Sequence, residues 1–136
     1  MPPKENHTTI GTEQWLRYAY SDLEIAGITP SPNMLLEGLC FHAQQAAEKS
    51  IKAVLIDRGV SFPRTHNIRT LLELIPPDIS IPEEIQEAAS LTDYAVSSRY
   101  PSDLELIGED EHQKAIHSAK RVVSWAENIV QLQKKD

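Results

Sequence analysis

The chain has 136 residues, a net charge of −7 and a single cysteine. This length suits one domain that buries roughly two thirds of its unfolded surface without disulfides or metal, and the negative charge argues against broad binding to duplex DNA, whose affinity depends on neutralising phosphates. No apolar run approaches about 20 residues and the N-terminus lacks the apolar core of a signal peptide, so we expect a cytoplasmic protein without a membrane span.

The N-terminal part predicts an arm and a first helix. Residues 1–11 contain two prolines and no periodicity, so we expect a flexible arm before a single domain over residues 12–136. Thr12 can cap a helix that runs to about Ile28, because apolar residues recur there at spacings of three, four and seven. Two prolines in residues 29–32 then break the helix, and the next helix should run antiparallel to it.

The longest uninterrupted helical pattern runs from Asn33, a candidate N-cap, to Gly59, a residue type expected just past a helix C-terminus. One broad face carries apolar and small residues, which lets neighbouring helices approach closely and predicts a central position. The opposite side carries a stripe that lacks a carboxylate, formed by His42, Gln45, Lys49 and Lys52. Such a stripe is either a solvated helix face or the edge of a ligand site, and the sequence leaves both open.

Three further helices are predicted in the rest of the chain. Thr65 or Asn67 can cap a short helix through about Ile75. A fourth helix opens with Ile-Pro and covers residues 81–97, and a last helix over residues 109–133 has the alternation of four and three that is typical of a bundle seam. The predicted fold class is all-α, an antiparallel up-and-down helical bundle of four long helices plus a short connector helix.

Motifs for metal or cofactor binding are absent from the sequence. No glycine-rich phosphate loop, HExxH motif, cysteine cluster or Glu-x-x-His pair occurs on the long helices. His112 and His117 lie five residues apart, about 140° around a helix, so they cannot share one metal from one face. The acids at 109–111 are better explained as residues that complement the helix dipole. We therefore predict neither a metal site nor a cofactor.

Two short segments combine an arginine with a ring or a hydroxyl at a helix end: FPRTHN at 62–67 and SRYP at 98–101. Functional groups concentrate on such segments because the scaffold holds them in place. The alternative is that Arg64 and Arg99 only tie loops to helix carbonyls, and both interpretations stay open. With the stripe on the central helix, the candidate ligand-binding residues are His42, Gln45, Lys49, Lys52, Arg64, His66, Arg99 and Tyr100. We predict that all of these except Gln45 and Lys52 line one cleft, in which cations hold a phosphate and Tyr100 stacks on a base.

Taken together, the stretches HAQQAAEKSIKAVL, FPRTHNI and SSRYP resemble the signature stretches of the HEPN domain family. The resemblance covers most of the chain. It implies a helical bundle that forms a homodimer, is often encoded beside a minimal nucleotidyltransferase as a toxin–antitoxin-like module, and takes its name from inferred nucleotide binding.

Many HEPN proteins are ribonuclease toxins that use an arginine followed by four to six residues and a histidine. None of the six arginines in this chain has a histidine at that distance. Loss of a general acid or base typically costs 100- to 10,000-fold in rate. This sequence therefore lacks the catalytic pair that the resemblance would imply, and we predict no catalytic residue.

The sequence predicts a non-catalytic, dimeric domain that binds a nucleotide, an RNA end or a partner minimal nucleotidyltransferase. Two alternatives stay open. One is a metal-independent ribonuclease with a non-standard set made of Arg99, His42 and His66, and the other is a purely structural dimerisation module.

Overall fold

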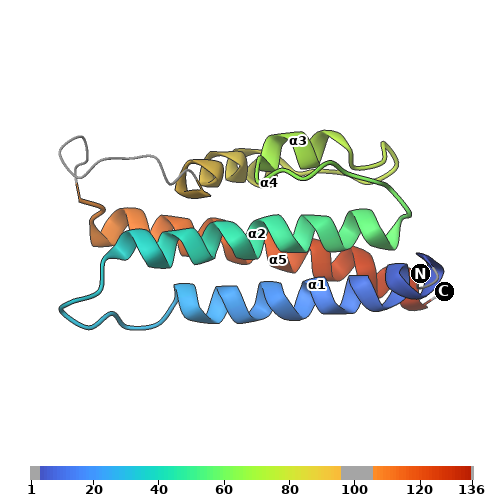
Figure 1. Ribbon diagram of the computed structural model, residues 1–136. Coiled ribbons are helices and arrows are strands. Elements are labelled where there is room, and N and C mark those ends of the chain that lie inside the picture. The colour runs from blue at the N-terminus through green and yellow to red at the C-terminus, as the bar shows by residue number, and fades with distance from the viewer. Residues whose placement is uncertain (1–3, 96–105, 136) are drawn as a thin grey trace.

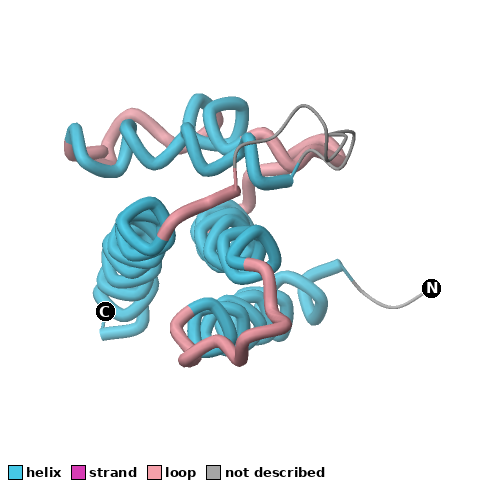
Figure 2. Tube along the Cα trace, turned by 90° about the vertical axis from the view of Figure 1, so that its left-hand side faces the viewer, coloured by secondary structure: helices cyan, strands magenta, loops and turns pink. Residues whose placement is uncertain are grey.

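Helices make up almost all of the regular structure. The computed structural model describes residues 4–95 and 106–135, and no strand occurs among them, which confirms the all-α fold class. The elements in chain order are α1 (Lys4–Ala26), α2 (Leu36–Asp57), α3 (Ile68–Glu73), α4 (Glu83–Glu87), the 3₁₀ helix η1 (Ala88–Ala95) and α5 (Glu109–Lys135). Figures 1 and 2 show α1, α2 and α5 lying side by side, with the short helices stacked over α2 and α5 on the side away from α1.

Helix α2 occupies the centre of the bundle. It packs against α1, α5, α3 and η1. Four of its alanines, Ala43, Ala46, Ala47 and Ala53, are fully buried. Small side chains at these positions let the neighbouring backbones approach closely, which confirms the central position that the sequence predicts.

The C-terminus of α2 is formed by the glycine that the sequence indicates. Gly59 has a φ of 70°, which favours glycine, and it follows the C-cap residue Arg58. The backbone N–H of Val60 donates to the carbonyl of Leu55 at 2.8 Å, and that of Gly59 donates to Ile56 at 3.0 Å. This is a Schellman motif, and it turns the chain sharply toward the segment that precedes α3.

The predicted N-cap of α2 is wrong. The helix begins at Leu36 with Leu35 as N-cap, and no side chain caps it. The backbone N–H of Met34 donates to the carbonyl of Ser31 at 3.0 Å, so Asn33 lies inside a turn before the helix starts. For α3 the sequence left two candidates, and Asn67 is the cap, because its side chain accepts from the backbone N–H of Thr70 at 3.1 Å.

The predicted start of the first helix is also wrong. Helix α1 begins at Lys4 rather than at Thr12, so residues 4–11, which we expected to form a loose arm, are helical. After the prolines at 2 and 3, the sequence contains no further proline before residue 30, so a good N-cap residue at 12 does not force a helix to begin there. Thr12 is instead buried within the helix.

The fourth helix begins where predicted, with Pro82 as N-cap, but it divides into the α-helical turn α4 and the 3₁₀ helix η1. Buried Ala88 and Leu91 lie three residues apart, which is the period of a 3₁₀ helix. The hydroxyl of Thr92 also accepts from the backbone N–H of Ile68 at 2.9 Å, which ties η1 to the start of α3. The predicted end near residue 97 lies outside the described residues.

Helix α5 supplies the predicted seam, since Ala115, Ala119, Val122 and Ala126 are buried and Ile129 packs against the core.

The only cysteine, Cys40 of α2, is fully buried near α5. Burial, together with the negative charge of Glu111, raises the pKa of the Cys40 thiol to about 11. Cys40 is therefore a protonated core residue at neutral pH. Within the described residues, no helix is long and apolar enough to cross a membrane.

Candidate ligand site on the central helix

A ladder of three polar side chains runs along α2 at spacings of four residues. The Glu48 side chain is only 2% exposed, and its Oε2 lies 2.7 Å from Nζ of Lys52, whose side chain is 8% exposed. Nε2 of Gln44 donates to Oε1 of Glu48 at 2.8 Å. Residues four apart on a helix are neighbours, so the sequence spacing itself builds this buried group.

The segment between α2 and α3 completes the group around Glu48. Nδ1 of His66 lies 2.9 Å and 3.2 Å from the two carboxylate oxygens of Glu48. Gln44 also donates to the backbone carbonyl of His66 at 3.2 Å. Both the side chain and the backbone of His66 therefore bind the segment to α2. Nε2 of Gln45 bonds Oε1 of Gln44 at 2.7 Å and approaches Glu48 at 3.4 Å.

Glu48 is ionised in this environment. Burial by itself raises the pKa of the carboxyl group, but hydrogen bonds from Lys52, Gln44 and His66 and the charge of Lys52 act the other way and together lower the pKa below its ordinary value. A buried carboxylate with this many donors is a fixed negative charge, which holds Lys52 and His66 in place.

A second group of the same kind joins α1 to α2. Asp22, which is buried on α1, places Oδ1 2.9 Å from Nδ1 of His42 and Oδ2 2.7 Å from Nζ of Lys49. His42 and Lys49 are seven residues apart and therefore lie on the same side of α2. The carboxylate of Asp22 bridges them across the α1–α2 contact.

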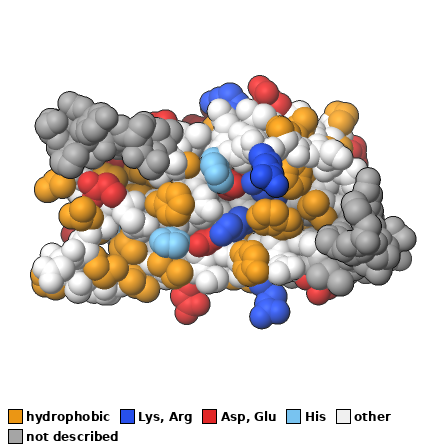
Figure 3. Space-filling model, viewed as in Figure 1, with side chains coloured by type: hydrophobic (Ala, Val, Ile, Leu, Met, Phe, Trp, Pro, Cys, Tyr) orange, Lys and Arg blue, Asp and Glu red, His pale blue; other side chains and the backbone are white. Residues whose placement is uncertain are grey.

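Aromatic rings border both lysines. Nζ of Lys52 lies 5.4 Å from the centre of the Trp15 ring and 5.6 Å from that of Phe62, and Nζ of Lys49 lies 5.7 Å from that of Tyr18. These distances suit cation–π interactions. Figure 3 shows histidine, basic and acidic side chains gathered near the middle of this side of the molecule, with hydrophobic side chains between them.

We call this surface the α2 polar face: His42, Gln45, Lys49 and Lys52 of α2 with Arg64 and His66. In both histidines Nδ1 contacts a carboxylate, and no hydrogen bond from a described residue reaches Nε2. A neutral imidazole in this arrangement donates from Nδ1 and keeps Nε2 as an acceptor, whereas a protonated one presents an N–H to a ligand. The face can therefore offer ammonium, guanidinium and imidazole donors to an anion.

The structure brings most of the predicted site residues together, but in two groups. His42 and Lys49 meet at Asp22, whereas Gln45, Lys52 and His66 meet at Glu48. Arg64 is exposed on the connecting segment and forms no ion pair with a described residue. Arg99 and Tyr100 lie outside the described residues, so the prediction of a single cleft that contains them stays a prediction.

The interpretation of the stripe as a solvated helix face is wrong at Lys52, which is buried and paired. Sequence reasoning also missed the two carboxylates on which the groups are centred. Glu48 could have been found from its spacing of four to both Gln44 and Lys52. Asp22 could have been found because it lies between Ala19 and Ala26 at spacings of three and four, and an acid within an apolar seam indicates a buried pair.

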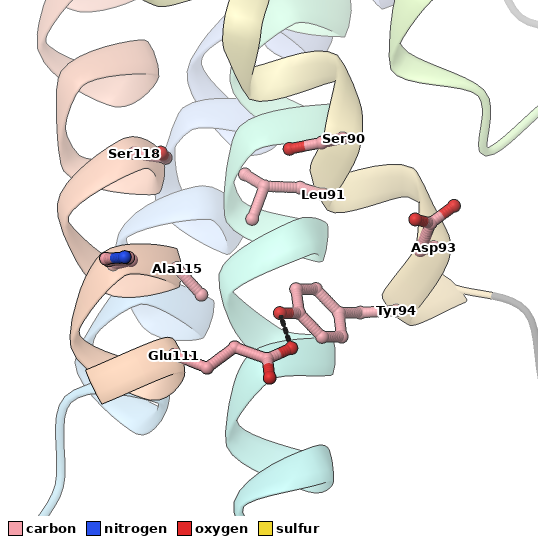
Figure 4. Close-up of a pocket in the computed structure, with 8 residues that line it drawn as sticks. Ser90, Leu91, Asp93, Tyr94, Glu111, Ala115 and Ser118 are labelled. Carbon is pink, nitrogen blue, oxygen red and sulfur yellow. Dashed lines mark hydrogen bonds between the residues drawn. The ribbon is translucent and has the colours of Figure 1, made fainter. Parts of the chain in front are cut away.

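A separate cavity of about 280 Å³ lies between η1 and α5 and contains none of the predicted residues. In Figure 4 the phenol of Tyr94 and the carboxylate of Glu111 point toward each other across it, and they form a hydrogen bond. Burial and this hydrogen bond raise the pKa of Tyr94 above its ordinary value. The pair ties η1 to α5. No cluster that could hold a metal ion occurs among the described residues.

The HEPN domain family model matches residues 12–129. The chain belongs to the HEPN domain family. This HEPN domain is 28% identical over 131 residues to the protein named "Putative toxin MJ1304" of Methanocaldococcus jannaschii, a match that covers 87% of this chain and 82% of the relative.

Two solved structures have the same fold as this HEPN domain. The crystal structure of TT1696 from Thermus thermophilus has a TM-score of 0.73 at 29% identity, covering 87% of this chain and 97% of that one. The crystal structure of ST0689, an archaeal HEPN homologue, has a TM-score of 0.66 at 28% identity, covering 88% and 97%. Both likenesses extend over nearly the whole of the solved chains.

Replacing Glu48 tests whether it is central to the site. Glu48→Ala leaves Lys52 buried without an anion, so the free energy of unfolding in urea at pH 7 should fall by about 3–5 kcal/mol. Glu87→Ala, an exposed acid on α4, should change it by less than about 0.5 kcal/mol. Glu48→Met with Lys52→Met removes both charges and should recover most of the loss. A loss in Glu48→Ala no larger than that in Glu87→Ala would contradict this account.

The same interaction makes the free energy of unfolding depend on pH in the acid range. Because folding lowers the pKa of Glu48, its stabilising contribution is present above the ordinary carboxyl value of 4.5 and is lost as the pH falls through the lowered folded value. The difference between wild type and Glu48→Ala should therefore shrink below about pH 4.5. Urea titrations from pH 7 to pH 3 measure it.

Proposed function

We propose that this HEPN domain is a non-catalytic, toxin-like module of the cytoplasm that forms a homodimer and binds a nucleotide or an RNA end at the α2 polar face. The observation that carries the proposal is that Lys49 and Lys52 are each held by a buried carboxylate and bordered by aromatic rings, on the same face as Arg64, which pairs with no described acid. Side chains fixed in advance lose little conformational entropy when a ligand binds.

The charge of the face supports an anionic ligand. Asp22 and Lys49 cancel, as do Glu48 and Lys52, so with neutral histidines Arg64 leaves the face with a positive excess. In a chain of net charge −7, this is a local site for phosphate rather than a general attraction to nucleic acid.

The toxin-like part of the proposal rests on the relative that is named a putative toxin. The family resemblance of the three signature stretches supports a minimal nucleotidyltransferase as a partner. Such an enzyme would itself carry a bound nucleotide, so docking of that enzyme and nucleotide binding at the α2 polar face are compatible roles.

Calorimetric titration tests the binding site. Wild type should bind ATP or a short 5′-phosphorylated RNA saturably, and Arg64→Ala should weaken binding about ten- to 100-fold, because it removes one charge-assisted contact. Arg121→Ala, an exposed arginine on α5, is the matched control and should bind like wild type. If wild type binds neither ligand at millimolar concentration, the structural dimerisation module replaces this proposal.

A ribonuclease is the second candidate, and one observation favours it. His42 and His66 both have a carboxylate on Nδ1 and an Nε2 without a described partner, which is the arrangement of an imidazole that transfers protons. Against it, the chain lacks the arginine and histidine spacing of the ribonuclease members of the family.

We expect purified protein with a chelator present to leave single-stranded RNA intact over hours. The expected reason is the missing arginine and histidine pair. Any cleavage that is seen should persist in His42→Ala, His66→Ala and Arg99→Ala, which would identify it as a contaminant. Cleavage that is lost in Arg99→Ala and in one histidine variant, with the helical circular dichroism unchanged, would establish the enzyme instead.

Dimerisation is tested by sedimentation velocity. At tens of micromolar, the protein should sediment as a species of about twice 15.3 kDa, since obligate dimer interfaces commonly bury more than about 2,000 Å². A species of 15.3 kDa that persists at this concentration would reject the dimer.

A further inference from the structure

A groove follows one face of α1, next to the α2 polar face. Two cavities form it, one of about 500 Å³ and one of about 200 Å³, and Gln14 and Tyr18 line both of them. The other lining residues are Gly11, Glu13, Trp15, Arg17 and Ser21. Residues 11, 14, 15 and 18 have helical spacings of three, four and seven, so they lie on one side of α1.

Two aromatic rings form the wall between this groove and the α2 polar face. Tyr18 is 51% exposed, and its hydroxyl accepts a hydrogen bond from Nε2 of Gln14 at 2.9 Å. Lys49 lies 5.7 Å from the centre of the Tyr18 ring, and Lys52 lies 5.4 Å from that of Trp15. Each ring therefore has a cation of α2 beside it and also lines the groove.

We propose that the α1 groove binds the base of the nucleotide or RNA end whose phosphate is held at the α2 polar face, with the base stacked on Tyr18. This inference rests on the proposed function. It adds a binding site for the base, which the phosphate contacts cannot recognise. An aromatic ring stacks on any base, so the groove favours ligands with a base over plain phosphate and shows little sequence preference.

The residues around the two rings suit this occupant. Arg17 lines the groove, is exposed and makes no ion pair with a residue in the described ranges, so it is available to a second phosphate of the ligand. The smaller cavity is bordered mainly by Gly11, Trp15 and Tyr18, a largely apolar surface that matches the flat face of a base. Nζ of Lys49 lies 5.7 Å from the centre of the Tyr18 ring, so this ring connects the groove to the α2 polar face.

A second copy of the chain is the competing occupant of an exposed aromatic helix face. A symmetric contact would place the same surface of both subunits together. Arg17, which forms no ion pair with any residue that the structure describes, and the adjoining α2 polar face favour a phosphate-bearing ligand. Sedimentation distinguishes the two occupants.

The test compares two ligands that differ only in their bases. One is a 5′-phosphorylated adenosine trinucleotide of RNA, and the other is an abasic ribose-phosphate trimer with the same number of phosphates. Calorimetry should show that Tyr18→Ala weakens binding of the trinucleotide about ten- to 100-fold, the loss expected for one stacked base. The same variant should bind the abasic trimer at most about two- to five-fold more weakly than wild type, because it removes only the cation–π contact of Lys49. Tyr18→Phe, which keeps the ring, should bind both ligands like wild type.

Tyr20→Ala is the matched control, because Tyr20 is another exposed tyrosine of α1 but bonds Glu127 of α5 outside the groove. It should bind both ligands like wild type. If Tyr18→Ala binds the trinucleotide like wild type while Arg64→Ala is impaired, the groove is not the base site and the proposed function survives. If wild type binds neither trimer and no ATP, both proposals fall. If Tyr18→Ala changes the sedimentation coefficient rather than the affinity, a second copy covers the groove and this inference is overturned.

Discussion

The buried carboxylate of Glu48 is the interaction on which the site depends. It lies on the central helix and binds a lysine of the same helix and a histidine from the segment that leads to α3. An ion removed from water must be compensated by several good hydrogen bonds, and here Lys52, Gln44 and His66 supply them. Because the lysine and the histidine depend on the same anion, the helix and the segment that follows it are positioned together.

This arrangement separates the roles of the two sides of α2. The alanine-rich side sets how closely the helices pack, whereas the polar side sets where the charged groups stand. Asp22 has the same role between α1 and α2, where it pairs with Lys49. Each lysine of the face therefore has its own buried anion. The chemistry is thus built into the helix contacts rather than placed on a loop that would have to order itself around a ligand.

Much of the fold was predictable because its signals are local. Gly59 and Asn67 were recognisable by residue type, and the seam of α5 by its spacing. The early start of α1 was not predictable, because no side chain marks it. The 3₁₀ form of η1 was not predictable either, because tertiary hydrogen bonds such as that of Thr92 shape it. For the site, spacing identified the cations, but Asp22 comes from another helix, and only the packing of α1 on α2 shows which charges meet.

The single cysteine has a practical consequence for work on this protein. Cys40 is enclosed by the core, and its high pKa leaves the thiol protonated under ordinary labelling conditions. An engineered cysteine at an exposed position such as Ser61, beside the segment that carries Arg64, would react with a maleimide dye long before Cys40 does. Fluorescent or spin probes can therefore be attached to this HEPN domain without first removing its natural thiol.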